Sequence, residues 1–99
     1  MMQDASFQTP ITELFGIEHP IVCGGLMWLS DARYVSAVVN AGAMGFITPR
    51  SFADLDSFRA ELETCRELTG GRPFGVNLYI SGQERHNEQV NAWVDASLD

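Results

Sequence analysis

Two neighbouring glycines are the residues best suited to hold a flat ligand in this sequence. Gly24 and Gly25 follow the apolar run 20–23 and precede the apolar residues 26–29. Because glycine has no Cβ atom, the backbone at these positions can approach a planar ligand closely or adopt a positive φ angle. The alternative is a tight strand-to-helix turn packed beneath Trp28.

A single polar residue, Asn77, interrupts the apolar run 74–80 with a side chain that carries both donors and acceptors. A buried strand tolerates such a side chain only when its polar atoms are paired. In barrels of parallel strands, ligand contacts come from the carboxyl ends of the strands. Asn77 is therefore either a ligand contact or a structural asparagine that bonds neighbouring loop backbone.

The other reactive side chains form no catalytic pattern. Cys23 requires a nearby base or helix N-terminus to act as a nucleophile, so we expect it to pack as a small apolar group. We expect a structural role for His19, solvent exposure for His86 and an exposed loop position for Arg50. Because Cys23 and Cys65 form no C-x-x-C motif and no cluster with histidine, no disulfide framework or metal site is predicted. We assign no catalytic residue and no metal ligand.

Two further patterns are better explained by structure than by chemistry. Asp54 and Asp56, like Glu61 and Glu63, are two residues apart and point away from each other on a helix, which predicts a solvated face. The G-x-x-G pattern at 42–45 follows a helix and precedes a strand, the reverse of a dinucleotide-binding loop. We interpret it as a helix stop.

These residues are set among alternating strand and helix patterns. A short leader helix is predicted over 9–16, because Thr9 can cap it, Pro10 suits its first position and Gly16 can end it. The apolar runs predict buried strands at 20–23, 44–47 and 74–80. Helices are predicted between and after them, from Ser30 to Gly42, from Ser51 or Asp54 to Leu68, and from about Asn87 onward. Their apolar faces comprise Tyr34, Ala37, Val38 and Ala41 in the first, Leu55, Phe58, Leu62 and Cys65 in the second, and Val90, Trp93, Val94 and Leu98 in the third.

The charge pattern excludes several kinds of partner. Six basic and thirteen acidic residues give a net charge of −7, and no basic block exists to follow a nucleic-acid backbone. The longest apolar run, 20–29, contains two glycines and is far shorter than the roughly 20 residues of a membrane-spanning helix. Residues 1–9 contain no Lys or Arg and no apolar segment typical of a secretory signal. We expect a cytoplasmic protein without a nucleic-acid or membrane partner.

The order of elements after the leader helix is βαβαβα. Strands separated by helices indicate parallel pairing through right-handed crossovers. Since a closed (β/α)₈ TIM barrel takes about 250 residues, a chain of this length supplies at most three of its eight units. We expect residues 1–99 to be the N-terminal portion of a single α/β domain of this kind.

Four segments together resemble a known family. They are GIEHPIV at 16–22, GGLMW at 24–28, NAGAMGFI at 40–47 and RPFGVNL at 72–78. In this order and spacing they resemble the N-terminal part of the nitronate monooxygenases, which are FMN-dependent TIM-barrel enzymes. FMN-dependent enoyl-acyl-carrier-protein reductases are similar over the same segments. The similarity extends over nearly the whole chain from Thr9.

The resemblance implies a flavin site. Gly24, Gly25 and Leu26 match the loop whose backbone lies against the flavin ring in the family, and Asn77 matches the asparagine that contacts FMN. Cys23 replaces the usual Gln or Ala, and Leu26 replaces a frequent Met with another apolar side chain that lacks the polarisable sulfur.

The implied activity is the oxidation of a small-molecule nitronate by FMN, with oxygen as the electron acceptor. The family's catalytic histidine and phosphate-binding loops are expected beyond Asp99, so residues 1–99 alone should have no turnover and weak FMN affinity. Two alternatives remain at this point. One is FMN- and NAD(P)H-dependent enoyl reduction, and the other is a non-enzymatic α/β module that forms a homo-oligomer by burying its strand edges.

Overall fold

The protein is a small parallel α/β structure, seen in a computed structural model that describes residues 7–83 and 87–99. His86, expected to be exposed, lies outside the described residues. The elements are α1 (Pro10–Phe15), β1 (Val22–Cys23), α2 (Ala32–Asn40), β2 (Met44–Ile47), the 3₁₀ helix η1 (Pro49–Ser51), α3 (Leu55–Thr69), β3 (Gly75–Val76) and α4 (Val90–Leu98). The sheet order is β1-β2-β3, and both pairings are parallel. The predicted parallel α/β organisation is confirmed.

The predicted helix ends are largely confirmed. Thr9 and Thr12 form a reciprocal capping box at the start of α1, and Gly16 ends that helix at a φ of +67°. Asp54 caps α3, the second of the two starts considered. Ser30, however, does not cap α2. The Asp31 carboxylate accepts the hydrogen bond from the Tyr34 amide instead, at 2.9 Å.

Two of the three strands are shorter and more exposed than predicted. The strand expected over 20–23 is reduced to Val22–Cys23, and the one expected over 74–80 is reduced to Gly75–Val76. Ile21 is 54% exposed and Tyr79 is 59% exposed. Among residues 7–83 and 87–99, each outer strand pairs only with β2, whereas a parallel strand is fully buried only when it has neighbours on both sides and layers on both faces. The central strand, Met44–Ile47, is buried as predicted.

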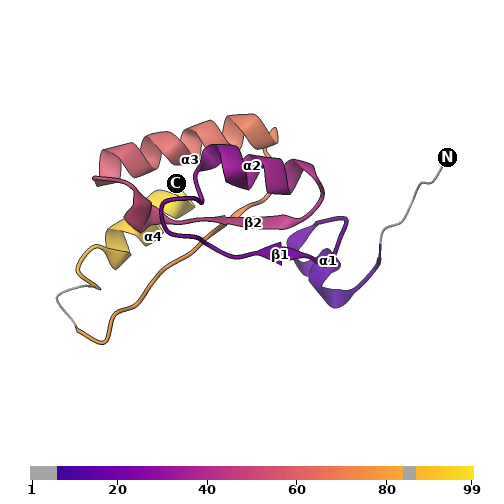
Figure 1. The fold of residues 1–99 in the computed structure, drawn as a ribbon, viewed down its shortest axis with the longest axis horizontal. Coiled ribbons are helices and arrows are strands. Elements are labelled where there is room, and N and C mark those ends of the chain that lie inside the picture. The colour runs from indigo at the N-terminus through magenta and orange to yellow at the C-terminus, as the bar shows by residue number, and fades with distance from the viewer. Residues whose placement is uncertain (1–6, 84–86) are drawn as a thin grey trace.

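The core lies between the sheet and two helices that run side by side over one of its faces, α2 and α3 (Figure 1). The predicted apolar face of α3 is confirmed, because Phe58, Leu62 and Cys65 are all buried. The face predicted for α2 is only partly correct, because Tyr34 and Val38 are half-buried whereas Ala37 and Ala41 are exposed. The helix instead buries Ala32, Val35, Ser36 and Val39.

A glycine on β2 allows α2 to lie close to the strand. A Cβ atom placed on Gly45 would lie 3.2 Å from Cγ1 of Val35 and 3.3 Å from the Val35 carbonyl oxygen. Cβ of Val38 would lie 3.4 Å away, so the absence of a side chain at Gly45 lets the helix approach the strand at both Val35 and Val38. Ala37, on the predicted face, is exposed.

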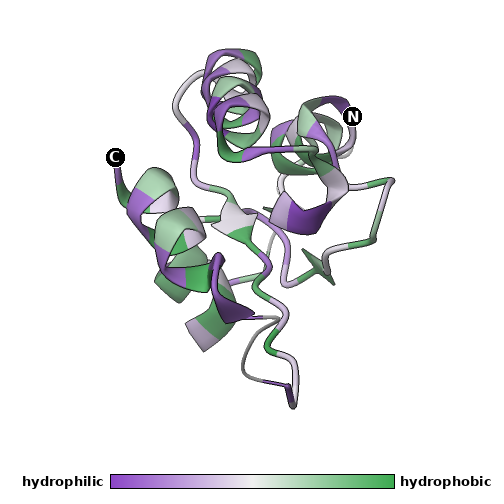
Figure 2. Ribbon diagram, turned by 90° about the vertical axis from the view of Figure 1, so that its left-hand side faces the viewer, coloured by the Kyte–Doolittle hydropathy of each residue, from purple (hydrophilic) through white to green (hydrophobic). Residues whose placement is uncertain are grey.

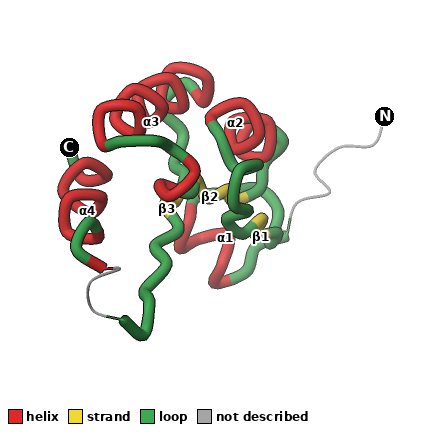
Figure 3. Tube along the Cα trace, turned by 60° about the vertical axis from the view of Figure 1, so that its left-hand side comes forward, coloured by secondary structure: helices red, strands yellow, loops and turns green. Residues whose placement is uncertain are grey.

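The last helix, α4, packs against α3 (Figure 3). Trp93 is buried as predicted, but Leu98 is 81% exposed, so the predicted apolar face is only partly correct. Arg59 of α3 pairs with Asp99 at 2.6 Å where α4 ends. None of the helices within 7–83 and 87–99 combines the length and hydrophobicity needed to cross a bilayer.

Candidate functional site

The carboxyl ends of the three strands converge on Gly25. A Cβ atom placed on this residue would lie 2.6 Å from Cβ of Asn77 and 2.6 Å from Oγ1 of Thr48. Gly25 follows β1, Thr48 follows β2 and Asn77 follows β3, so the contact joins all three strand ends. Only glycine fits here without displacing a neighbour. Two of the sequence-predicted site residues, Gly25 and Asn77, are thus brought together.

Thr48 was not singled out by the sequence analysis as a site residue. It is 3% exposed, and its hydroxyl has no hydrogen-bond partner among the described residues. Its position directly after a predicted buried strand was the available indication, since barrel strands carry functional residues there.

The neighbouring glycine, Gly24, faces open space. A Cβ atom placed on it would meet no atom within 4 Å, and the structure assigns it no positive φ. Leu26, on the other side of Gly25, is 46% exposed, and its amide donates to Oγ of the buried Ser30 at 2.6 Å. The loop therefore presents accessible backbone at Gly24 beside an anchored apolar side chain, an arrangement that accommodates a flat ligand.

The backbone of Asn77 is hydrogen-bonded to the neighbouring strand, whereas its side chain makes no hydrogen bond to the described residues. Its amide N–H donates to the Ile47 carbonyl at 2.8 Å, which extends the β2–β3 pairing by one residue. Its half-buried side-chain amide has no hydrogen bond within the part of the chain that the structure describes. The structural alternative, a side-chain bond to nearby loop backbone, is therefore not found there.

The apolar loop after Gly25 contains an unusual backbone conformation. Trp28 has a φ of +70°, the only positive φ at a non-glycine position in the described residues. Its amide donates to Oγ of Ser51 at 2.8 Å, so η1 braces the loop from the end of β2. The Leu29 and Ser30 amides both donate to the Leu26 carbonyl and close the turn.

Arg50 does not occupy the exposed loop position that was expected. Its guanidinium carbon lies 4.9 Å from the ring centroid of Trp93 and 5.4 Å from that of Tyr79, in the range of cation–π contacts. Its Nη2 donates to the Tyr79 carbonyl at 3.5 Å. Arg50 therefore connects η1 and α4 to the segment just beyond Asn77.

Several other side chains have structural roles. Glu61 was predicted to lie on a solvated face, but its half-buried carboxylate accepts a hydrogen bond from the Ala32 amide at 2.7 Å and so supports the start of α2.

Cys23 is a half-buried free thiol. Burial raises the pKa of the Cys65 thiol to about 11, and the nearby Glu61 carboxylate adds to this effect. No cluster of three or more possible metal ligands occurs among residues 7–83 and 87–99.

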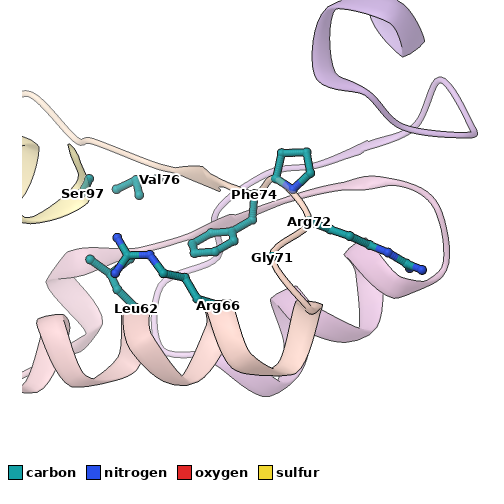
Figure 4. Close-up of a pocket in the computed structure, with 8 residues that line it drawn as sticks. Leu62, Arg66, Gly71, Arg72, Phe74, Val76 and Ser97 are labelled. Carbon is teal, nitrogen blue, oxygen red and sulfur yellow. The ribbon is translucent and has the colours of Figure 1, made fainter. Parts of the chain in front are cut away.

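A separate cavity of about 320 Å³ lies near the amino end of β3. In Figure 4 its wall combines Leu62 and Arg66 of α3 with Phe74, Val76 and Ser97. Arg66 is already paired with Glu63 at 3.0 Å. Because ligand sites of parallel α/β folds lie at the carboxyl ends of the strands, we place the candidate site at Gly25 and not in this cavity.

The fold is a parallel α/β structure whose three strand ends meet at Gly25. Comparison with known sequences is more specific, because residues 8–97 match the profile of the nitronate monooxygenases. The chain belongs to the nitronate monooxygenase family, a family of oxidoreductases.

Individual relatives carry two kinds of name. A protein of Mycobacterium tuberculosis (strain ATCC 25618 / H37Rv), named (3aS,4S,5R,7aS)-5-hydroxy-7a-methyl-1-oxo-octahydro-1H-indene-4-carboxyl-CoA dehydrogenase, is 44% identical over 71 residues, which are 72% of this chain and 19% of the relative. A probable nitronate monooxygenase of Staphylococcus aureus (strain JH9) is 30% identical over 88 residues, which are 85% of this chain and 24% of the relative. The chain spans about a fifth to a quarter of the length of these relatives.

Proposed function

We propose that this chain is the N-terminal part of an FMN-dependent oxidoreductase that oxidises nitronates. Residues 1–99 supply the first three βα units of its TIM barrel. The observation that carries the proposal is the convergence of Gly25, Thr48 and Asn77 at the carboxyl ends of three adjacent parallel strands. Family membership, with a relative named as a probable nitronate monooxygenase, supports it.

The residues present fit a flat cofactor. At Gly24, the open space on the Cβ side lets backbone lie against an aromatic ring system. The half-exposed Leu26 supplies an apolar contact next to it. The Asn77 side chain offers one acceptor and two donors that the described chain leaves available for polar ring-edge atoms.

When bound, FMN supplies the redox chemistry, accepting electrons from the substrate and passing them to oxygen. The role of this chain is to bind and orient. Gly25 holds the loop against Thr48 and Asn77, which fixes the relative positions of the β1 and β3 ends. The chemical steps on the substrate require residues outside 1–99, so these residues alone should show no turnover.

A second candidate reaction is supported by the relative at 44% identity, whose name describes a dehydrogenase of a bicyclic carboxyl-CoA thioester. The same flavin-binding strand ends would serve that chemistry, with a different substrate.

The experiment is to express the complete reading frame that contains residues 1–99 and analyse the purified product. We expect a flavin absorbance spectrum, release of FMN on denaturation, and oxygen consumption with a simple nitronate such as ethylnitronate. Release of FMN without nitronate oxidation, together with dye reduction by a carboxyl-CoA thioester, would favour the second candidate. A product that neither contains nor binds FMN would contradict the proposal and favour the self-associating module.

A further inference from the structure

The loop between β1 and α2 holds a tryptophan in a conformation that its side chain disfavours. Trp28 has a φ of +70°, in the left-handed region where bulky residues are rare. The conformation is held from two sides, by the Ser51 hydroxyl on the Trp28 amide and by the turn that closes on the Leu26 carbonyl. Residues kept in such regions concentrate at binding and catalytic sites, where surrounding structure maintains them.

The indole gains no compensating burial in this structure. Trp28 is 74% exposed, and the loop also exposes Leu26, Met27 and Leu29 by 46%, 43% and 64%. Trp93, in contrast, is only 5% exposed in the core. The loop therefore presents a large aromatic surface three residues after Gly25, on the side of the sheet where the strands end.

We infer that Trp28 is a specificity-determining residue whose indole forms an apolar wall of the substrate pocket and favours substrates with a bulky apolar group. This inference rests on the proposed function, because it assigns the substrate class of the same site. A wide, rigid aromatic surface stabilises apolar ligand groups through buried area at little conformational cost. The two-sided bracing of the loop keeps that surface in place before the substrate arrives.

The test uses the product of the complete reading frame and two substrates, ethylnitronate and the nitronate of nitrocyclohexane. Trp28→Gly removes the wall and suits the positive φ, so its melting temperature should be unchanged or higher. We expect the ratio of its kcat/KM for the cyclohexyl substrate to its kcat/KM for ethylnitronate to fall by about tenfold or more, mainly through the KM of the cyclohexyl substrate. Trp28→Phe should retain most of the preference.

Leu14→Ala is the matched control. Leu14 has the same 74% exposure but lies on α1, which precedes β1 and does not contribute to the strand ends. Its selectivity should equal that of the wild type.

The possible outcomes test the proposed function and the inference about Trp28 separately. Wild-type protein that oxidises neither nitronate would overturn the proposed function and this inference with it. Wild-type activity with unchanged selectivity in Trp28→Gly would overturn the inference alone. A lowered melting temperature with unchanged selectivity would also overturn it, by showing that the indole serves packing.

Discussion

Gly24 and Gly25 are adjacent in sequence but differ in what surrounds them. A Cβ atom placed on Gly25 would overlap Asn77 and Thr48, whereas one placed on Gly24 would have no atom of the described residues within 4 Å. The same substitution should therefore change stability by different amounts at the two positions. A large effect at Gly25 would indicate packing, and a small one at Gly24 would leave that position available for ligand contact.

Gly25→Ala should destabilise the protein by about 1–3 kcal/mol, because the added methyl overlaps the Asn77 Cβ and the Thr48 hydroxyl. Gly24→Ala should change the unfolding free energy by less than about 0.5 kcal/mol, since its methyl enters open space. Urea denaturation of both variants measures the difference. Equal stability of the two would show that the strand ends do not meet as described.

The two thiols should differ in reactivity. The pKa of Cys65 is raised to about 11 from an ordinary 9.0, so the folded state holds the thiol proton more tightly than the unfolded state. The associated stability is complete below about pH 9 and is lost as the pH rises toward about 11. Alkylation at pH 8 with mass spectrometry of peptides should modify Cys23 in the native protein, and Cys65 only in denaturant. Rapid modification of Cys65 in the native state would contradict its burial.

At the level of single helices, one hydrogen bond that joins α2 and α3 beside their shared apolar core runs from the Ala32 amide to the Glu61 carboxylate. Glu61→Gln weakens a charge-assisted bond at a helix N-terminus, so we expect a loss of about 1–2 kcal/mol. Glu63→Gln is the control, because its exposed pair with Arg66 should contribute less than about 0.5 kcal/mol. Denaturation of the two variants should rank them in this order, and the reverse order would contradict the role of Glu61.

Local sequence rules predicted the helix ends well, and tertiary contacts explain the remaining differences. Thr9 and Gly16 act through their own backbone and hydroxyl geometry, which neighbouring residues suffice to predict. Ser30 failed as a cap because its hydroxyl bonds the Leu26 amide of the preceding loop. The close approach of α2 to β2 involves Gly45 on the strand, a contact that helical periodicity cannot reveal.

The candidate site was predicted in part for the same reason. Gly25 and Asn77 were found from glycine and asparagine signals in separate apolar runs, and their proximity follows from parallel strand pairing. Thr48 and Ser51 each lie 23 positions along the chain from the loop residue that they contact, Gly25 and Trp28 respectively. No local pattern encodes such contacts.

The whole molecule leaves apolar surface uncovered. Within the described chain, β1 and β3 each pair only with β2, and Figure 2 shows hydrophobic residues along the loop that follows β3, where Tyr79 and Ile80 are exposed. Open strand edges and exposed apolar patches promote association.

Residues 1–99 expressed alone should therefore associate or aggregate in sedimentation velocity, and should bind FMN weakly if at all. A monomer with cooperative unfolding would show instead that the three strands are stable without further barrel units.

The most direct test of flavin binding at the strand ends is the FMN dissociation constant of Gly24→Val, measured by fluorescence titration of the deflavinated product of the complete reading frame. Gly82→Val is the matched control, because Gly82 also has open space at its Cβ position and lies outside the site. We predict at least about tenfold weaker FMN binding for Gly24→Val, equivalent to about 1.4 kcal/mol, with unchanged stability and no effect of Gly82→Val. Wild-type affinity in Gly24→Val would contradict the placement of the flavin against this loop.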